Sequence, residues 1–246
     1  MKTTLFLTLT ALMALPAWAA DLADEVKAAA KKLADKPNYS WSVKVESAQE
    51  GQGRGFSAPP SGKTEKDGYT LLTYTMGDRT VEAVRKGDKV AVKSGDDWKS
   101  GEELAADSGD GGFNRQRAMG RMVQQARLPA SQAQELAGLL KEKDVKKDGE
   151  AYSATLTGEA IKQLSPFGGR RPGGDGGGGP DTSGLKGTAK FWVKDGVLSK
   201  YEIHIEGKMT FGQNERDISR STITEIQDVG STKIEVPAEA KKKLGA

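Results

Sequence analysis

Hydrophobic and polar residues alternate along several stretches of the chain, which is the pattern of strands with one buried face. In the sequence YSWSVKVE, which begins at Tyr39, the residues Trp41, Val43 and Val45 share one side with Tyr39. Both this segment and a longer one at 197–211 are therefore predicted to be half-buried strands. The apolar side of the longer segment consists of Val197, Tyr201, Ile203, Ile205, Met209 and Phe211.

Two-residue turns of Gly and Asp separate three further β-patterned segments, 69–76, 79–86 and 89–94. Asp195-Gly196 likewise separates 185–193 from 197–211. Such turns join neighbouring antiparallel strands, so we expect β-meanders. Further strands are predicted at 150–156, 215–229 and 233–237, with a bulge in 215–229, where the alternation is less regular. A polar loop is predicted at 48–68.

Apolar residues recur at helical spacing in an N-terminal segment, 21–36, and in two segments at mid-chain, 113–127 and 131–141. Ser131 is expected to cap the second of the mid-chain helices, and Thr157 to cap a short helix that follows it.

A sheet with one apolar face must cover that face. The predicted helices carry apolar stripes, and strands flank them in sequence on both sides, so one sheet is more economical than two domains. We therefore expect an α+β fold over residues 20–246, a single domain in which the N-terminal and mid-chain helices pack on the concave face of a curved antiparallel sheet. Such a layout leaves space for a hydrophobic ligand between sheet and helices.

Residues 1–19 read MKTTLFLTLTALMALPAWA, with a basic start, a short apolar run and a small-x-small ending. This is the pattern of a cleaved signal peptide, and it predicts a periplasmic or secreted protein with no transmembrane segment after cleavage. The chain has no cysteine, which excludes disulfides, thiol chemistry and a lipid-modified cysteine.

Composition and motifs argue against most other functions. The net charge of +3 is spread over segments of mixed sign, so we expect no nucleic-acid partner. The single histidine, His204, lies between Glu202 and Glu206 on the polar side of a predicted strand, where residues two apart are roughly 6.6 Å apart, too far for a compact metal site. With no nucleophile motif and no calcium-loop spacing in DSGDGG (107–112), we expect neither catalysis nor a cofactor or metal.

The stretch GGRRPGGDGGGGPDTSG, residues 168–184, lacks the Gly-Lys-Ser/Thr ending of a phosphate-binding loop and is followed by a strand. We interpret it as a flexible connection within the domain and hypothesise that it forms a flap at the rim of the ligand space.

Two hairpins and the order of elements resemble those of the lipoprotein-carrier superfamily (LolA/LolB-like proteins, including mycobacterial lipid-carrying lipoproteins). RKGDKVAVKSGDDWKS (85–100) is similar to that family's hairpin ending in tryptophan, and AKFWVKDGVLSKYEIHI (189–205) is similar to its aromatic hairpin. The resemblance covers 22–237 as a layout. It implies an unclosed β-barrel around a hydrophobic cavity that carries acyl chains in the periplasm.

Two functions follow from this interpretation. The first is a monomeric carrier or sensor that binds a hydrophobic small molecule or an acyl chain. The second is an envelope module that binds a protein or polymer through its outer face or its loops, with no lipid cavity, so that the apolar residues form only a packed core. Trp192 is a candidate surface contact. The candidate cavity residues are Trp41, Val43, Val45, Phe191, Val193, Tyr201, Ile203, Ile205, Met209 and Phe211.

Overall fold

The computed structural model describes residues 22–47, 60–66, 68–76, 79–106, 115–140, 145–164, 181–211 and 214–245. The predicted signal peptide, the segment 107–112 and residues 168–180 of the glycine-rich stretch lie outside these residues. Within the described part, no helix is long and apolar enough to cross a bilayer.

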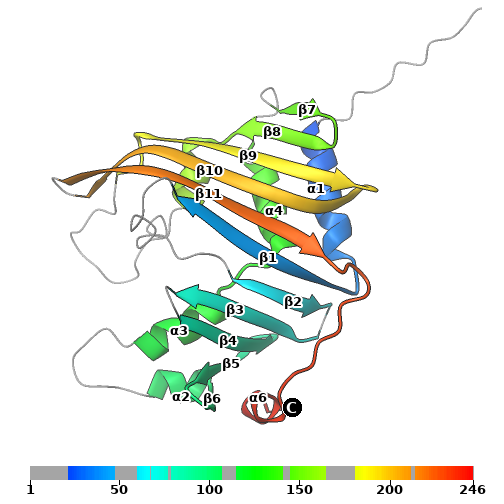
Figure 1. The fold of residues 1–246 in the computed structure, drawn as a ribbon, viewed down its shortest axis with the longest axis vertical. Coiled ribbons are helices and arrows are strands. Elements are labelled where there is room, and N and C mark those ends of the chain that lie inside the picture. The colour runs from blue at the N-terminus through cyan, green and yellow to red at the C-terminus, as the bar shows by residue number, and fades with distance from the viewer. Residues whose placement is uncertain are drawn as a thin grey trace, which may run out of the picture.

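The strands that the structure describes form one 11-stranded antiparallel sheet, in the order β6-β5-β4-β3-β2-β1-β11-β10-β9-β8-β7 (Figure 1). The sheet is curved and its two edge strands do not pair with each other, which confirms the predicted α+β class and open sheet. The strands are β1 (Asn38–Ser47), β2 (Ser61–Glu65), β3 (Thr70–Met76), β4 (Arg79–Lys86), β5 (Lys89–Ser94), β6 (Asp97–Ser100), β7 (Lys146–Asp148), β8 (Ala151–Thr155), β9 (Leu185–Lys194), β10 (Val197–Phe211) and β11 (Asn214–Gln227).

Strand β1 joins two parts of the sheet that are distant in sequence. Its first residues, from Asn38 to Trp41, pair with β2, and residues from Ser40 to Ser47 pair with β11. The local meander β2–β6 is thereby continuous with the long C-terminal strands β9–β11.

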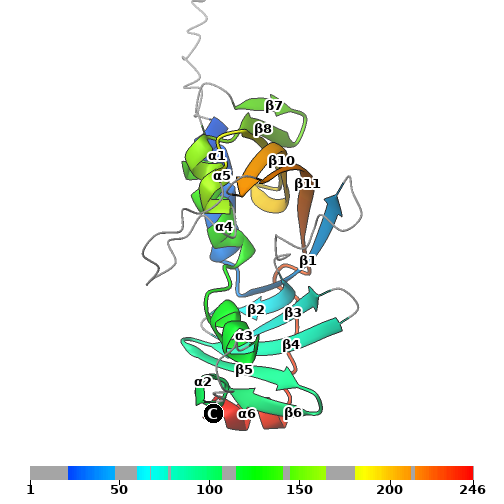
Figure 2. The same ribbon diagram turned by 90° about the vertical axis from the view of Figure 1, so that its left-hand side faces the viewer.

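Helices cover both faces of the sheet, but unequally (Figure 2). The helices α1 (Leu22–Ala34), α4 (Pro129–Gly138) and α5 (Gly158–Leu164) lie over the long strands. On the same face, which we call the inner face, α2 (Gly101–Ala106) and α3 (Arg115–Gln124) pack on the β4–β6 part. The C-terminal helix α6 (Ala238–Lys243) packs against β5 and β6 from the opposite face, where Ala240 and Leu244 form a small hydrophobic cluster with Val84, Ala91 and Trp98.

The inner face is buried by the residues that the sequence pattern selects. Helix α1 buries Val26 and Leu33, which are 0% exposed, together with Ala23, Ala29 and Ala30. Burial of each such side chain contributes about 1.5–3 kcal/mol, so this one stripe accounts for much of the attachment of α1. Thr157 caps α5 as predicted, because its Oγ accepts a hydrogen bond from the backbone N–H of Ala160 at 3.1 Å.

The expected bulge occurs in a different strand. β11 pairs with β10 in continuous register, whereas the pairing of β10 with β9 shifts between Leu198 and Lys200. The prediction of a bulge in β11 was therefore wrong. The shift explains why Leu198 is 0% exposed although strict alternation assigns it to the polar side.

Three local predictions were wrong, and one helix was missed. The expected polar loop 48–68 contains β2, and residues 233–237 form no strand but lead to α6. Helix α4 begins at Pro129 after Leu128, so Ser131 is not its cap. Helix α2 was not predicted, although the sequence carries its signal: Ser100 and Glu103 form a reciprocal capping box, with hydrogen bonds of 2.7 and 3.2 Å.

Candidate hydrophobic binding site

An apolar groove of about 710 Å³ lies between the sheet and the pair of helices α2 and α3. Its apolar walls come from four elements: Val81 on β4, Val92 on β5, Leu104 on α2 and Met119 on α3. We call this the apolar groove. Its size is within the range of about 300–1,000 Å³ that is usual for small-molecule sites.

Each wall is held in place by identifiable contacts. The capping box of Ser100 fixes the start of α2 and so places Leu104. At the other wall, Arg85 on β4 donates to the carbonyl oxygens of Gln124 and Ala126 at the end of α3 (3.3 and 2.6 Å). A cation at a helix C-terminus is favourable, because unpaired carbonyls and the helix dipole meet there.

Polar residues form the rim of the apolar groove rather than its floor. Lys93 and Glu82 form an exposed ion pair, with Nζ and Oε2 3.1 Å apart. Gln116 accepts a hydrogen bond from Lys99 at 3.0 Å. The arrangement suits an amphiphile whose apolar part enters the groove while its polar end stays at the rim.

The apolar groove is continuous with the main hydrophobic cluster of the protein. Val92, Leu104 and Met119 are 3%, 1% and 8% exposed and belong to the same cluster as Phe191 and Tyr201 on the long strands. The groove thus borders the main cluster, and three of its four apolar wall residues are themselves part of that cluster.

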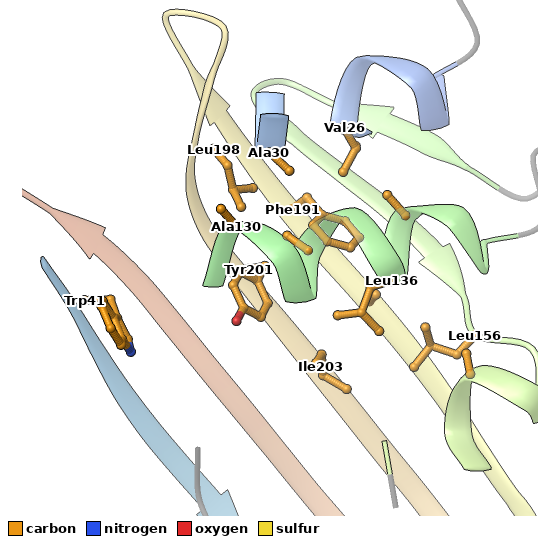
Figure 3. Packing of buried hydrophobic residues seen from close by; sticks show 14 of the residues in the cluster. Val26, Ala30, Trp41, Ala130, Leu136, Leu156, Phe191, Leu198, Tyr201 and Ile203 are labelled. Atoms are coloured by element: carbon orange, nitrogen blue, oxygen red, sulfur yellow. The ribbon is translucent and has the colours of Figure 1, made fainter. Parts of the chain in front are cut away.

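Phe191, Tyr201 and Ile203, three of the sequence-predicted cavity residues, lie on the long strands beside α4 (Figure 3). Phe191 and Tyr201 are each 1% exposed and stack with ring centroids 6.3 Å apart. In Figure 3 these two rings and Ile203 point toward Ala130 and Leu136 of α4, while Trp41 lies apart from them on β1. Six of the ten are buried in the cluster: Trp41, Phe191, Tyr201, Ile203, Ile205 and Met209.

The other four predicted residues are less enclosed. Val43 and Val193 are partly buried and pack against the cluster, and Val45 is half-buried at the far end of β1. The side chain of Phe211 lies outside the described part of the structure. That these ten residues line a ligand cavity stays a prediction.

Buried hydroxyls on the inner face are kept neutral. Tyr201 donates a hydrogen bond to Gln132 Oε1 at 2.6 Å, and Tyr74 donates to the carbonyl of Met122 at 3.3 Å. Desolvation raises the pKa of Tyr39 to about 12 and raises the pKa of Tyr74 and Tyr201 well above the ordinary value. These side chains therefore act as neutral hydrogen-bonding groups in an apolar layer.

A smaller pocket, of about 410 Å³, lies beside Trp98 and Leu71, which belong to the hydrophobic cluster around α6 on the outer face. His204 contacts Ser221 Oγ at 2.9 Å and Glu206 at 3.4 Å, and the described residues contain no group of three metal ligands. Trp192 is half-buried beneath the Nζ of Lys200, which lies 4.7 Å from its ring centroid.

Sequence analysis missed the apolar groove because each of its walls is a single side chain from a different element. Val81 and Val92 lie in predicted strands, but nothing in their spacing indicates that helices would leave them uncovered. The one available signal was the S-x-x-E pattern at Ser100, which marks α2 and thus Leu104.

No protein-family model matches the chain, and no curated protein matches it. Among solved structures, lipoprotein LppX of Mycobacterium tuberculosis is similar with a TM-score of 0.47 and 14% identity, over 87% of this chain and 97% of LppX. LprF of Mycobacterium bovis gives a TM-score of 0.44 and 11% identity, over 89% of this chain and 96% of LprF.

Proposed function

We propose that this protein is a non-catalytic, exported binding protein that carries or senses a hydrophobic ligand such as an acyl chain. The observation that carries the proposal is the apolar groove, an opening of about 710 Å³ with apolar walls on an otherwise covered face.

The chemistry of the groove supports an apolar ligand rather than a charged one. Its floor consists of Val92, Leu104 and Met119, and the ion pair of Lys93 and Glu82 is confined to the rim. Burial of apolar surface there supplies the binding free energy, at about 0.8 kcal/mol for each methylene group that leaves water.

A ligand longer than the apolar groove would extend along the inner face toward the predicted cavity residues. Phe191 and Tyr201 are now covered by α1 and α4, so contact with them requires that these helices move outward. We propose that Trp41, Phe191, Tyr201 and their neighbours form this deeper part of the site when a long chain is bound.

The test is to fill the apolar groove and measure binding of a fatty acid that carries an environment-sensitive fluorophore. Val81→Trp places an indole in the groove, and excluding even two methylene groups of the probe costs about 1.6 kcal/mol, or roughly tenfold in affinity. Val229→Trp is the matched control, because Val229 is 38% exposed and lies in a turn far from the groove in sequence.

We expect the control to bind like the unmodified protein and Val81→Trp to bind at least about tenfold more weakly. Native mass spectrometry of the purified protein should also detect a co-purifying lipid. Equal binding by both variants would remove the apolar groove as the site, and failure of the unmodified protein to bind probe or lipid would refute the proposed function.

A further inference from the structure

Helices α2 and α3 border a second groove, of about 740 Å³, on the side away from the apolar groove. Its walls carry five basic residues from the β4–β5 hairpin, α3 and α6, against the acidic Asp88 and Glu102. We call this the basic groove; its basic residues are Lys89, Arg117, Arg121, Lys242 and Lys243.

Three of these cations remain available to a ligand. Lys89, Arg121 and Lys242 have no carboxylate partner within ion-pair distance among the residues that the structure describes. The other two are engaged: Lys243 pairs with Glu103 at 2.5 Å, and Arg117 donates to the carbonyl of Ala105 at 2.7 Å. α3 itself has no acidic residue.

The elements that carry the three cations are fixed relative to one another. Gln124 of α3 donates to the carbonyl of Asp88 in the hairpin at 3.4 Å, next to Lys89. The pairing of Lys243 with Glu103 ties α6 to α2, and Leu244, 2% exposed, anchors the end of α6 in the smaller core. The cations are thus presented from a preorganised concave surface, which lowers the entropic cost of binding an anion.

The geometry points to the basic groove as a docking site for the phosphate of an anionic lipid headgroup at a membrane surface. Lys and Arg side chains are the usual ligands of phosphate, as point charges and as planar donors respectively. The basic groove gathers several of these side chains in one concave site, whereas an ordinary surface charge stands alone in solvent.

A lipid source is favoured over a soluble phosphate by the position of the apolar groove. Leu104 and Met119 line the apolar groove, and their sequence neighbours Ala105 and Gly120 line the basic groove. The two grooves are therefore separated by one layer of helix, about 10 Å thick. A lipid whose headgroup is held at the basic groove therefore lies within about one helix diameter of the apolar groove. The docking stands on the charges alone, and only its purpose rests on the proposed function.

Vesicle flotation tests this inference. The unmodified protein should bind vesicles of phosphatidylglycerol, bind those of phosphatidylcholine weakly, and release from both as salt increases, because the attraction is electrostatic. The triple variant Lys89→Glu, Arg121→Glu, Lys242→Glu should partition at least about 100-fold more weakly, at about fivefold for each basic residue lost.

A matched triple variant controls for net charge. Lys162→Glu, Lys194→Glu, Lys233→Glu changes the charge equally at exposed positions that line neither groove, and it should retain most of the binding. Circular dichroism checks that both variants fold. If the groove variant is unfolded, the corresponding Lys→Gln and Arg→Gln variant takes its place, with a smaller expected loss.

The inference is overturned if both triple variants lose binding equally, or if phosphatidylcholine vesicles bind as well as phosphatidylglycerol. Binding of soluble glycerol phosphate to the groove without binding of anionic vesicles would assign the site to a free phosphate instead. Binding of the fluorescent fatty acid should be unchanged in the groove variant, so failure of docking and failure of the proposed hydrophobic site give different results.

Discussion

Gly187 on β9 lies directly beneath α5, and its substitution tests how closely that helix packs on the sheet. A methyl group built at Gly187 would lie 2.9 Å from Leu156 Cδ1, 3.2 Å from Ile161 Cγ1 and 3.3 Å from the carbonyl oxygen of His204. The first of these distances is shorter than carbon atoms tolerate, so α5 or Leu156 must shift in Gly187→Ala.

Such overpacking lowers the free energy of unfolding by about 1–3 kcal/mol. Alanine also restricts the unfolded chain more than glycine does, which raises the free energy of unfolding by about 0.4–1 kcal/mol. The free energy of unfolding should therefore fall by about 1–2 kcal/mol. For a protein of this size the melting temperature should fall by about 2–8 °C. Gly138→Ala is the matched control: Gly138 ends α4 and has nothing within 4 Å of its added methyl, so that variant should gain about 0.5 kcal/mol.

If α5 packs this closely on β9, urea unfolding should show a lower free energy of unfolding for Gly187→Ala and a higher one for Gly138→Ala than for the unmodified protein. In a double-mutant cycle, Gly187→Ala should cost less in a Leu156→Val background, because the shorter side chain makes room for the methyl group. A neutral or stabilising Gly187→Ala, or a cost unchanged by Leu156→Val, would contradict the packing described for α5.

Two further predictions concern pH. The raised pKa of Tyr39, Tyr74 and Tyr201 adds stability that is complete below pH 10 and is lost as pH rises toward about 12, the pKa of Tyr39. The tyrosinate absorbance of these three side chains should therefore appear only as circular dichroism shows unfolding. Ionisation of all five tyrosines at the ordinary value in the intact fold would contradict the burial of these three. The Tyr152 hydroxyl, 2.5 Å from Glu25, and then Lys147 lower the pKa of the Glu25 carboxyl below its ordinary 4.5. Tyr152→Phe should therefore have a lower free energy of unfolding than the unmodified protein at neutral pH, and this difference should shrink as pH falls below 4.5. A difference in unfolding free energy that is constant with pH would show that the hydrogen bond does not depend on ionised Glu25.

The sequence predicts the inner face well because a strand repeats every two residues whatever surrounds it. Tyr39, Trp41, Tyr201 and Met209 are buried as the alternation indicates. The alternation does not predict the burial of Leu198, because the bulge next to it changes the side of the strand on which it lies. No residue pattern near Leu198 indicates this bulge.

Among the helices too, residue spacing predicts those that pack along their length but not those whose position depends on tertiary contacts. The stripe of α1 is predicted from spacing, because it packs along its whole length. Helix α6 has only Ala240 and the following Leu244 as buried apolar residues, so its place on the opposite face depends on tertiary contact with Trp98. The apolar groove depends on where α2 and α3 fail to cover β4 and β5, and a local pattern does not encode that.

The double pairing of β1 has a consequence for how the chain folds. Strands β2–β6 can pair as they are synthesised, since each lies next to its neighbour in sequence. The other edge of β1 must wait for β11, whose Gln227 pairs with Ser40 and whose Arg220 pairs with Ser47. Pairing over such a separation is slow and leaves a strand edge open to other chains meanwhile. The N-terminal half of the protein is therefore expected to depend on protection from aggregation until its last strand arrives.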